Sequence, residues 1–128
     1  MSVNVVLTPN FEREAKKLIK KYRSLRSELL ELTQELEADP RKGALIRENV
    51  YKIRLAVRSK GKGKSGGMRV ITYVEAELVP KQGDIDVYLL SIYDKSDREN
   101  ISNQLIDQII DEVQSELKQT AQDNAEEE

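Results

Sequence analysis

Apolar and polar residues alternate along two neighbouring stretches in the middle of the chain. In residues 51–58 (YKIRLAVR), apolar residues alternate with mostly cationic ones, the period of a strand with one buried face. A second β-rich run, residues 68–74 (MRVITYV), follows a turn in which four glycines fall between positions 61 and 67, and glycine suits such turns. The pattern predicts a β-hairpin whose cations share one face.

The remaining apolar residues predict the other elements of an α+β domain. They indicate an N-terminal strand over residues 3–7, a helix hairpin over 11–22 and 25–36 with Ser24 as a cap, a turn at 80–84, a strand over 87–93 and a last helix capped by Ser102. The run 87–93 (VYLLSIY) is almost wholly apolar, as expected of a central strand covered on both sides. We expect a largely antiparallel sheet in which three strands continue after the hairpin of helices, with the helices packed on one face.

A chain of 128 residues fits one domain, which we assign to residues 1–118. Residues 119–128 lack apolar periodicity and end in three glutamates, so the sequence predicts an acidic, disordered tail. The second helix of the hairpin is expected to present an acidic outer face, formed by Glu28, Glu31, Glu35 and Glu37. The segment between this helix and the β-hairpin, which contains Gly43 and Asn49, is expected to be a loop.

The net charge of −2 hides an uneven distribution of charge. Residues 1–40 hold seven basic and seven acidic residues, residues 41–69 hold ten and one, and residues 70–128 hold four and fifteen. A basic middle and an acidic end can occupy opposite faces of one domain. The basic segment alone would attract a polyanion such as nucleic acid.

The absent residue types narrow the chemistry. The chain has no cysteine and no histidine, so it lacks thiolate ligands, disulfides, and the commonest metal ligand and general base. We therefore expect no metal site and no cofactor. No apolar run approaches the roughly 18 residues of a membrane span, and the N-terminus lacks the features of a signal peptide, so we expect a cytoplasmic protein without a membrane partner.

Three sequence motifs occur in one chain: YKIRL (51–55), GKSGGMRVITY (63–73) and VYLLSIYDKSD (87–97). With the order of elements, they resemble the RelE/ParE superfamily of toxin–antitoxin toxins over roughly residues 3 to 115, nearest to its RelE and HigB-like members. The resemblance implies an endonuclease that enters the A site of a translating ribosome and cuts the mRNA there. It also implies a cognate antitoxin protein that blocks the toxin.

In such a reaction the RNA 2′-hydroxyl attacks the adjacent phosphate. The site must help remove a proton, stabilise extra negative charge on phosphorus and protonate the leaving 5′-oxygen. Without histidine, clustered lysine and arginine can supply the charge stabilisation. Crowded cations also lower the pKa of a neighbouring lysine, and a tyrosine among them is expected to shift the same way.

The resemblance assigns site residues by position. The catalytic set is Lys52, Arg54, Arg69 and Tyr93, and the RNA-contacting set is Arg58, Lys60, Lys62, Lys64 and Lys95. Arg69 is the first choice for transition-state charge. For Lys52 the choice lies between proton transfer and phosphate binding, and for Tyr93 between stacking on a base and acting as acid or base.

Plainer interpretations stand beside these. Alternating cations such as Lys52 and Arg54 commonly form the solvated face of an antiparallel strand, and Tyr93 can be a tyrosine at the edge of the core. A glycine-rich turn between two strands is weak evidence for a phosphate cradle. The alternative function is a non-catalytic member of the same fold that binds RNA or DNA gyrase.

Overall fold

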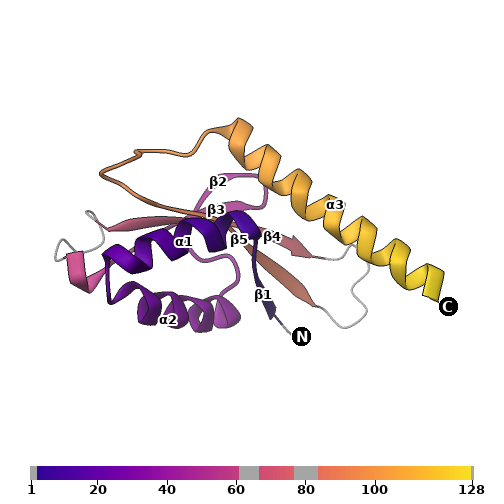
Figure 1. Cartoon of the computed structure of the whole chain (residues 1–128), viewed down its shortest axis with the longest axis horizontal. Coiled ribbons are helices and arrows are strands. Elements are labelled where there is room, and N and C mark those ends of the chain that lie inside the picture. The colour runs from indigo at the N-terminus through magenta and orange to yellow at the C-terminus, as the bar shows by residue number, and fades with distance from the viewer. Residues whose placement is uncertain (1–2, 61–66, 77–83, 128) are drawn as a thin grey trace.

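The computed structural model describes residues 3–60, 67–76 and 84–127. These residues form a five-stranded sheet in the order β1-β5-β4-β3-β2, flanked by three α-helices (Figure 1). The strands are β1 (Val3–Leu7), β2 (Ala44–Arg47), β3 (Val50–Leu55), β4 (Met68–Ala76) and β5 (Ile85–Asp94), and the helices are α1 (Pro9–Lys21), α2 (Leu25–Ala38) and α3 (Asn103–Glu127), with a 3₁₀ turn η1 (Arg58–Lys60) after β3. The predicted α+β fold is confirmed.

The predicted hairpin and central strand are both present. β3 pairs antiparallel with β4, and β4 pairs antiparallel with β5. β1 then adds to the far side of β5 in parallel, because α1 and α2 carry the chain away from the sheet after β1. β5 therefore lies between two strands, and all eight residues from Val87 to Asp94 are buried, as the apolar run predicted.

The expectation of a loop between the second helix and the hairpin is wrong. Residues 44–47 form β2, a four-residue edge strand that pairs antiparallel with β3. Its apolar side chains Leu45 and Ile46 are 63% and 40% exposed, so it lacks the buried alternation by which a strand is recognised. Gly43 and Asn49 flank it with φ angles of 102° and 63°, and these left-handed residues allow the chain to turn tightly at both ends.

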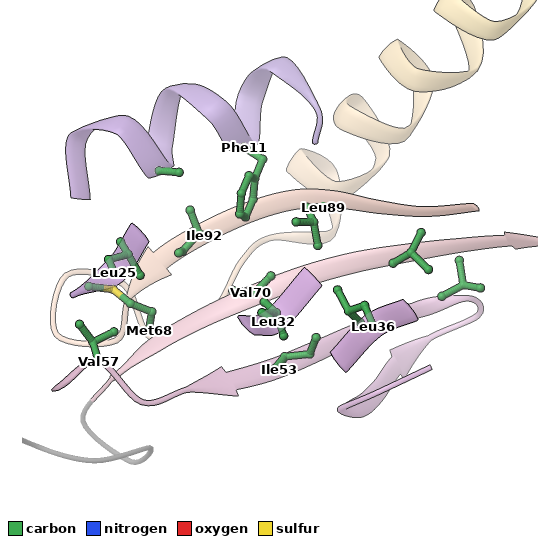
Figure 2. Packing of buried hydrophobic residues seen from close by; sticks show 13 residues of the cluster. Phe11, Leu25, Leu32, Leu36, Ile53, Val57, Met68, Val70, Leu89 and Ile92 are labelled. Atoms are coloured by element: carbon green, nitrogen blue, oxygen red, sulfur yellow. The ribbon is translucent and has the colours of Figure 1, made fainter. Parts of the chain in front are cut away.

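The expectation that all helices pack on one face is also wrong, because each face of the sheet has its own core. The first core joins α1 and α2 to side chains such as Ile53, Val70 and Leu89, and Figure 2 shows Phe11 of α1 lying over Leu89 and Ile92 of β5. The second core packs α3 against the side chains that β3, β4 and β5 direct to the other face. The strands contribute Val50, Ile71, Tyr88, Leu90 and Tyr93, and α3 contributes Ile106, Ile109, Ile110 and Val113. The apolar stripe of the last helix thus covers the opposite face (Figure 1).

Hydroxyl side chains cap two of the three helices. Thr8 accepts a hydrogen bond from the Phe11 N–H at 3.2 Å, and Ser102 accepts one from the Leu105 N–H at 3.1 Å, which confirms Ser102 as a cap. Ser24 precedes α2 but its hydroxyl makes no capping bond. That hydroxyl accepts a hydrogen bond from the Ser59 N–H instead.

The last helix extends into the segment that the sequence analysis assigns to an acidic tail. α3 continues past residue 118 to Glu127. Residues 119–127 contain glutamine, alanine and glutamate, which have good helix propensity even without an apolar stripe. In Figure 1 this end of α3 projects beyond the sheet.

Candidate functional site

Arg54, Arg69 and Tyr93 form a row across the three central strands. Arg54 of β3 is the direct register partner of Arg69 of β4, and Arg69 is the direct partner of Tyr93 of β5. Because directly opposed residues of antiparallel strands point to the same face, all three side chains share one face of the sheet. The strands thus bring together three of the four predicted catalytic residues.

Lys52, the fourth, lies two residues before Arg54 on the same face of β3. Its Nζ donates a hydrogen bond to Asn100 Oδ1 at 3.3 Å. Lys52 and Arg54 also line a hollow of about 310 Å³ beside the edge of the sheet, where Lys42 and Gly43 complete the wall. Ala44 and Ile53 also line this hollow, and its lining is mostly apolar.

The two arginines of the row are an unfavourable pair. Like charges directly opposite on antiparallel strands destabilise a sheet by roughly 0.2–1 kcal/mol. Arg54 is exposed, but Arg69 is only 4% exposed and donates from Nη1 to the Met68 carbonyl oxygen at 3.1 Å. Arginine is rarely so buried. The row therefore combines one exposed and one buried arginine on directly opposed positions.

Tyr93 places a buried hydroxyl at the end of the row. The side chain is 5% exposed, and its Oη has no hydrogen-bond partner among the residues that the structure describes. Burial raises the pKa of Tyr93, and the nearby Arg69 and Arg98 offset only part of that rise. The expectation that cations would lower the pKa of this tyrosine is therefore wrong, because loss of solvent outweighs them. At neutral pH the hydroxyl keeps its proton.

The segment between β5 and α3 crosses this face of the sheet and adds two residues that the sequence did not single out (Figure 1). The Arg98 guanidinium lies over the Tyr93 ring at 5.6 Å from its centroid, and Asn100 accepts the hydrogen bond from Lys52. Apart from Lys95, the sequence analysis treated residues 94–100 only as a connection. No local sequence pattern identifies Arg98 or Asn100, because their contacts with the row depend on how the segment folds back after β5.

Asp94, the last residue of β5, lies within the motif VYLLSIYDKSD, but the sequence analysis gave it no role. Its Oδ1 accepts hydrogen bonds from Lys60 Nζ at 2.7 Å, Ser96 N at 2.9 Å and Ser96 Oγ at 2.8 Å, and its Oδ2 accepts one from Tyr22 Oη at 3.1 Å. Burial would raise the pKa of Asp94, but the hydrogen bonds from Lys60 and Ser96 outweigh it and lower the pKa to about 2. Asp94 thereby connects the segment between β5 and α3 (residues 95–102, the covering segment) to η1 and to the end of α1.

Lys60 differs from its predicted role. We expected an RNA contact, but the side chains of Lys60 and Asp94 are 8% and 1% exposed in their ion pair. The ammonium also lies 5.5 Å from the centroid of the Tyr22 ring. This cation is enclosed by protein groups and belongs to the framework of the site.

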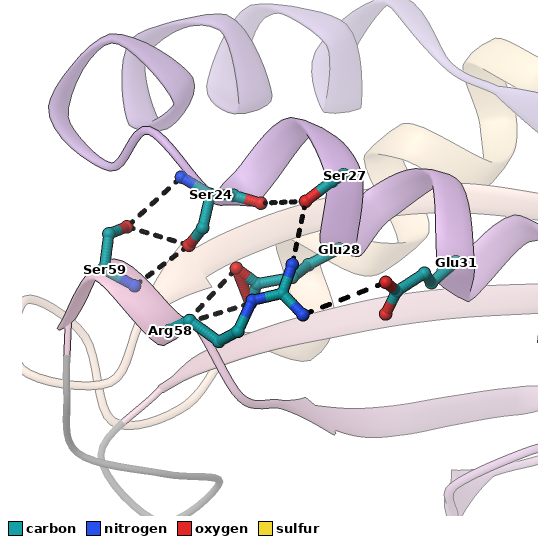
Figure 3. Close-up of polar contacts among 6 residues, drawn as sticks. All are labelled: Ser24, Ser27, Glu28, Glu31, Arg58 and Ser59. Atoms are coloured by element: carbon teal, nitrogen blue, oxygen red, sulfur yellow. Dashed lines mark hydrogen bonds and ion pairs between the residues drawn. The ribbon is translucent and has the colours of Figure 1, made fainter.

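Arg58 lies on the other side of the sheet, against α2. Its backbone N–H donates to both carboxylate oxygens of Glu28 at 3.2 Å, and its guanidinium contacts Ser27 and Glu31 (Figure 3). Glu28 is 4% exposed, so the expectation that it forms part of an outer acidic face is wrong. Figure 3 also shows Ser24 and Ser59 joined beside this contact. Together these bonds hold η1 to α2.

The remaining predicted RNA contacts have mixed outcomes. Lys95 is exposed, and its backbone N–H donates to the Gly67 carbonyl oxygen at 3.4 Å. It therefore sits beside the start of β4, one residue beyond Asp94. Lys62 and Lys64 lie outside the described residues.

No family model matches the chain, and a comparison with curated proteins gives no match either. The resemblance to RelE/ParE toxins thus rests on its motifs and remains untested by these comparisons. Within the described part of the chain, no three carboxylates gather as a metal site would require. No described helix is both long and apolar enough to span a membrane.

Proposed function

We propose that this protein is a ribosome-dependent mRNA endonuclease of the RelE/HigB type, the toxin of a toxin–antitoxin pair. The observation that carries the proposal is the row Arg54–Arg69–Tyr93, with Lys52 on the same face of the sheet. Directly opposed arginines, and a buried hydroxyl without a hydrogen-bond partner among the described residues, are unfavourable for stability. They suit a site that must balance the charge of a reacting phosphate.

In the proposed reaction, the RNA 2′-oxygen forms a bond to phosphorus and the bond from phosphorus to the 5′-oxygen breaks. The 2′-hydroxyl proton passes to water, and the products are a 2′,3′-cyclic phosphate and a free 5′-hydroxyl. Arg69 and Arg54 stabilise the added negative charge on the phosphate oxygens. Lys52 binds the phosphate, a role supported by its present use as a donor to Asn100.

Tyr93 acts as the general acid in this scheme. Its raised pKa keeps the proton on Oη at neutral pH, and the proton goes to the leaving 5′-oxygen. The tyrosinate left behind is stabilised by Arg69 and Arg98, the two groups that oppose the rise in its pKa. The second role considered for Tyr93, stacking on a base, is less well supported because Arg98 already covers the ring.

The test is cleavage of a defined mRNA by the purified protein in a reconstituted translation system. We expect cuts within codons at the ribosomal A site, no cuts without ribosomes, and loss of cleavage in Arg54→Ala and Arg69→Ala. Arg13→Ala, an exposed arginine of α1, is the matched control. Intact mRNA with the folded wild-type protein, or full cleavage by both row variants, would remove the proposal.

A second candidate is a non-catalytic binder of RNA or of DNA gyrase. The observation that favours it is enclosure: Arg69 and Tyr93 are 4% and 5% exposed, with Arg98 over the tyrosine ring. Such a protein would bind ribosomes or gyrase through exposed cations and leave mRNA uncut. Binding measured alongside the cleavage assay separates the two functions.

A further inference from the structure

A long apolar groove runs along the outer surface of the helix hairpin, on the side of the sheet away from the Arg54–Arg69–Tyr93 row. It has a volume of about 990 Å³ and is lined by residues of α1, α2 and the end of β1. Its apolar lining residues are Leu7, Phe11, Ala15, Ile19, Leu29 and Leu30. Leu30 is 63% exposed and Leu7 is 41% exposed, and neither belongs to the first core.

The rim of this groove is mainly cationic. Four cations, Lys16, Lys20, Arg23 and Arg26, line it against one acid, Glu12. All four are exposed, and none has an ion-pair partner among the residues that the structure describes. By contrast, Glu31 of α2 pairs with Arg58 of η1. The cations around the groove are thus open to carboxylates from outside.

From this combination we propose that the groove docks an acidic amphipathic helix of a separate protein. Apolar side chains spaced at i, i+4 and i+7 would enter the groove, and glutamates flanking them would meet the rim cations. α1 has 13 residues, a length of roughly 20 Å, which matches about four turns of a bound helix. Parallel α-helices in contact pack ridges into such grooves.

The chain's own acidic helix is a poor occupant. The apolar stripe of α3, including Ile106, Ile109 and Val113, is already buried in the second core. Beyond Leu117 the sequence of α3 contains no large apolar residue. The end of α3 from a second copy could therefore offer acidic charge to the groove but no large apolar side chain to fill it.

The proposal is independent of the nuclease function, because none of the groove residues belongs to the row. Occupancy of the groove would leave the row's face of the sheet uncovered. A partner bound here would therefore hold or deliver the protein, and inhibition would require a further contact elsewhere on the partner.

The experiment uses the full chain and a designed, fluorescent helical peptide of about 16 residues, with leucine at one stripe and glutamate around it. A peptide of the same composition with its leucines out of register is the control probe. We expect saturable binding of the first peptide only, weakened by added salt. Backbone amide shifts in NMR spectra should concentrate on α1, α2 and the end of β1.

Matched variants locate the site. Leu30→Glu should weaken binding about tenfold or more, whereas Leu45→Glu should not, although Leu45 of β2 is equally exposed at 63%. Lys20→Glu should weaken binding and reduce its salt dependence, whereas Lys17→Glu, an exposed lysine of α1 outside the groove, should not.

Three results would overturn the proposal. The first is failure of the peptide to bind at millimolar concentration, and the second is binding that Leu30→Glu does not change. The third is self-association of the chain, measured by sedimentation without peptide, that Leu30→Glu abolishes, because a second copy would then be the occupant. Circular dichroism of each variant confirms that it is folded.

Discussion

Lys60 and Asp94 form an ion pair at 2.7 Å between two nearly buried side chains. The pair joins the turn after β3 to the end of β5, the two strands that flank β4 in the sheet. Since Asp94 also receives bonds from Ser96 and Tyr22, one carboxylate holds the helix hairpin, η1 and the covering segment in fixed positions around the row.

Replacement of this carboxylate should be costly. We expect Asp94→Asn to lower the free energy of unfolding by about 3 kcal/mol, because it leaves a buried ammonium without its counter-charge. Urea denaturation followed by circular dichroism measures the change. Asp97→Asn, at an exposed position three residues later, should change stability little. Equal effects of the two substitutions would show that the ion pair does not organise this region.

Acid should destabilise the protein through the same group. The pKa of Asp94 is lowered from an ordinary value of 3.8 to about 2 in the folded state, so the folded protein holds this carboxylate charged more readily than the unfolded chain does. The resulting stability is complete above about pH 4 and is lost as the pH falls toward 2. Denaturation curves between pH 5 and 2 should show the loss, and Asp94→Asn should flatten it.

Arg54→Gln should stabilise the fold while impairing function. Removing one of two opposed arginines relieves repulsion worth about 0.5 kcal/mol, which thermal denaturation at low salt should detect. The gain should shrink in 1 M salt, because Arg54 is exposed and its charge is screened. A loss of stability in Arg54→Gln would instead mean that this arginine is a structural element of the sheet.

Tyr93→Phe separates a catalytic tyrosine from a core tyrosine. The substitution removes a buried hydroxyl that has no partner in residues 3–60, 67–76 and 84–127, so stability should stay the same or rise by about 1 kcal/mol. Cleavage should fall about 100-fold or more if Oη supplies the proton. Tyr88→Phe, at a similarly buried position of β5, should leave cleavage unchanged. Undiminished cleavage by Tyr93→Phe would assign proton transfer elsewhere.

Gly43→Ala should destabilise the start of β2, where Gly43 approaches β3 closely. Gly43 has a φ of 102°, and a Cβ at this position would lie 2.6 Å from the Lys52 carbonyl oxygen and 2.9 Å from Ile53 Cγ1. We expect a loss of more than about 1 kcal/mol, measured by denaturation. Ala44→Gly is a useful comparison, since Ala44 is exposed in the same edge strand, and an effect from it alone would argue against strain at Gly43.

The elements whose apolar pattern is strong were predictable from sequence. The alternation in residues 51–58 and the apolar run 87–93 predicted β3 and the central strand β5, and the apolar stripes predicted all three helices. β2 was missed because its apolar residues face solvent. The side of the sheet that α3 covers could not be read from its stripe, since an amphipathic helix can cover either face of a sheet that is apolar on both.

The sequence predicted which residues lie in the candidate site better than it predicted their burial and contacts. The motifs identified Arg54, Arg69 and Tyr93, and period two put Lys52 and Arg54 on one face. The burial of Lys60 and Glu28 depends on where η1 docks, which no local pattern encodes. The contacts of Asp94, Arg98 and Asn100 likewise depend on how a connecting segment folds back over the sheet.

The parallel pairing of β1 with β5 determines when the sheet can be completed during synthesis of the chain. Val3 pairs with Ile85, 82 positions later, and β1 has no other neighbour in the sheet. At ordinary elongation rates the first strand leaves the ribosome about 4 to 16 s before its partner. Until β5 emerges, β1 remains an open edge and the row lacks Tyr93, so the protein acquires its candidate site only late in its own translation.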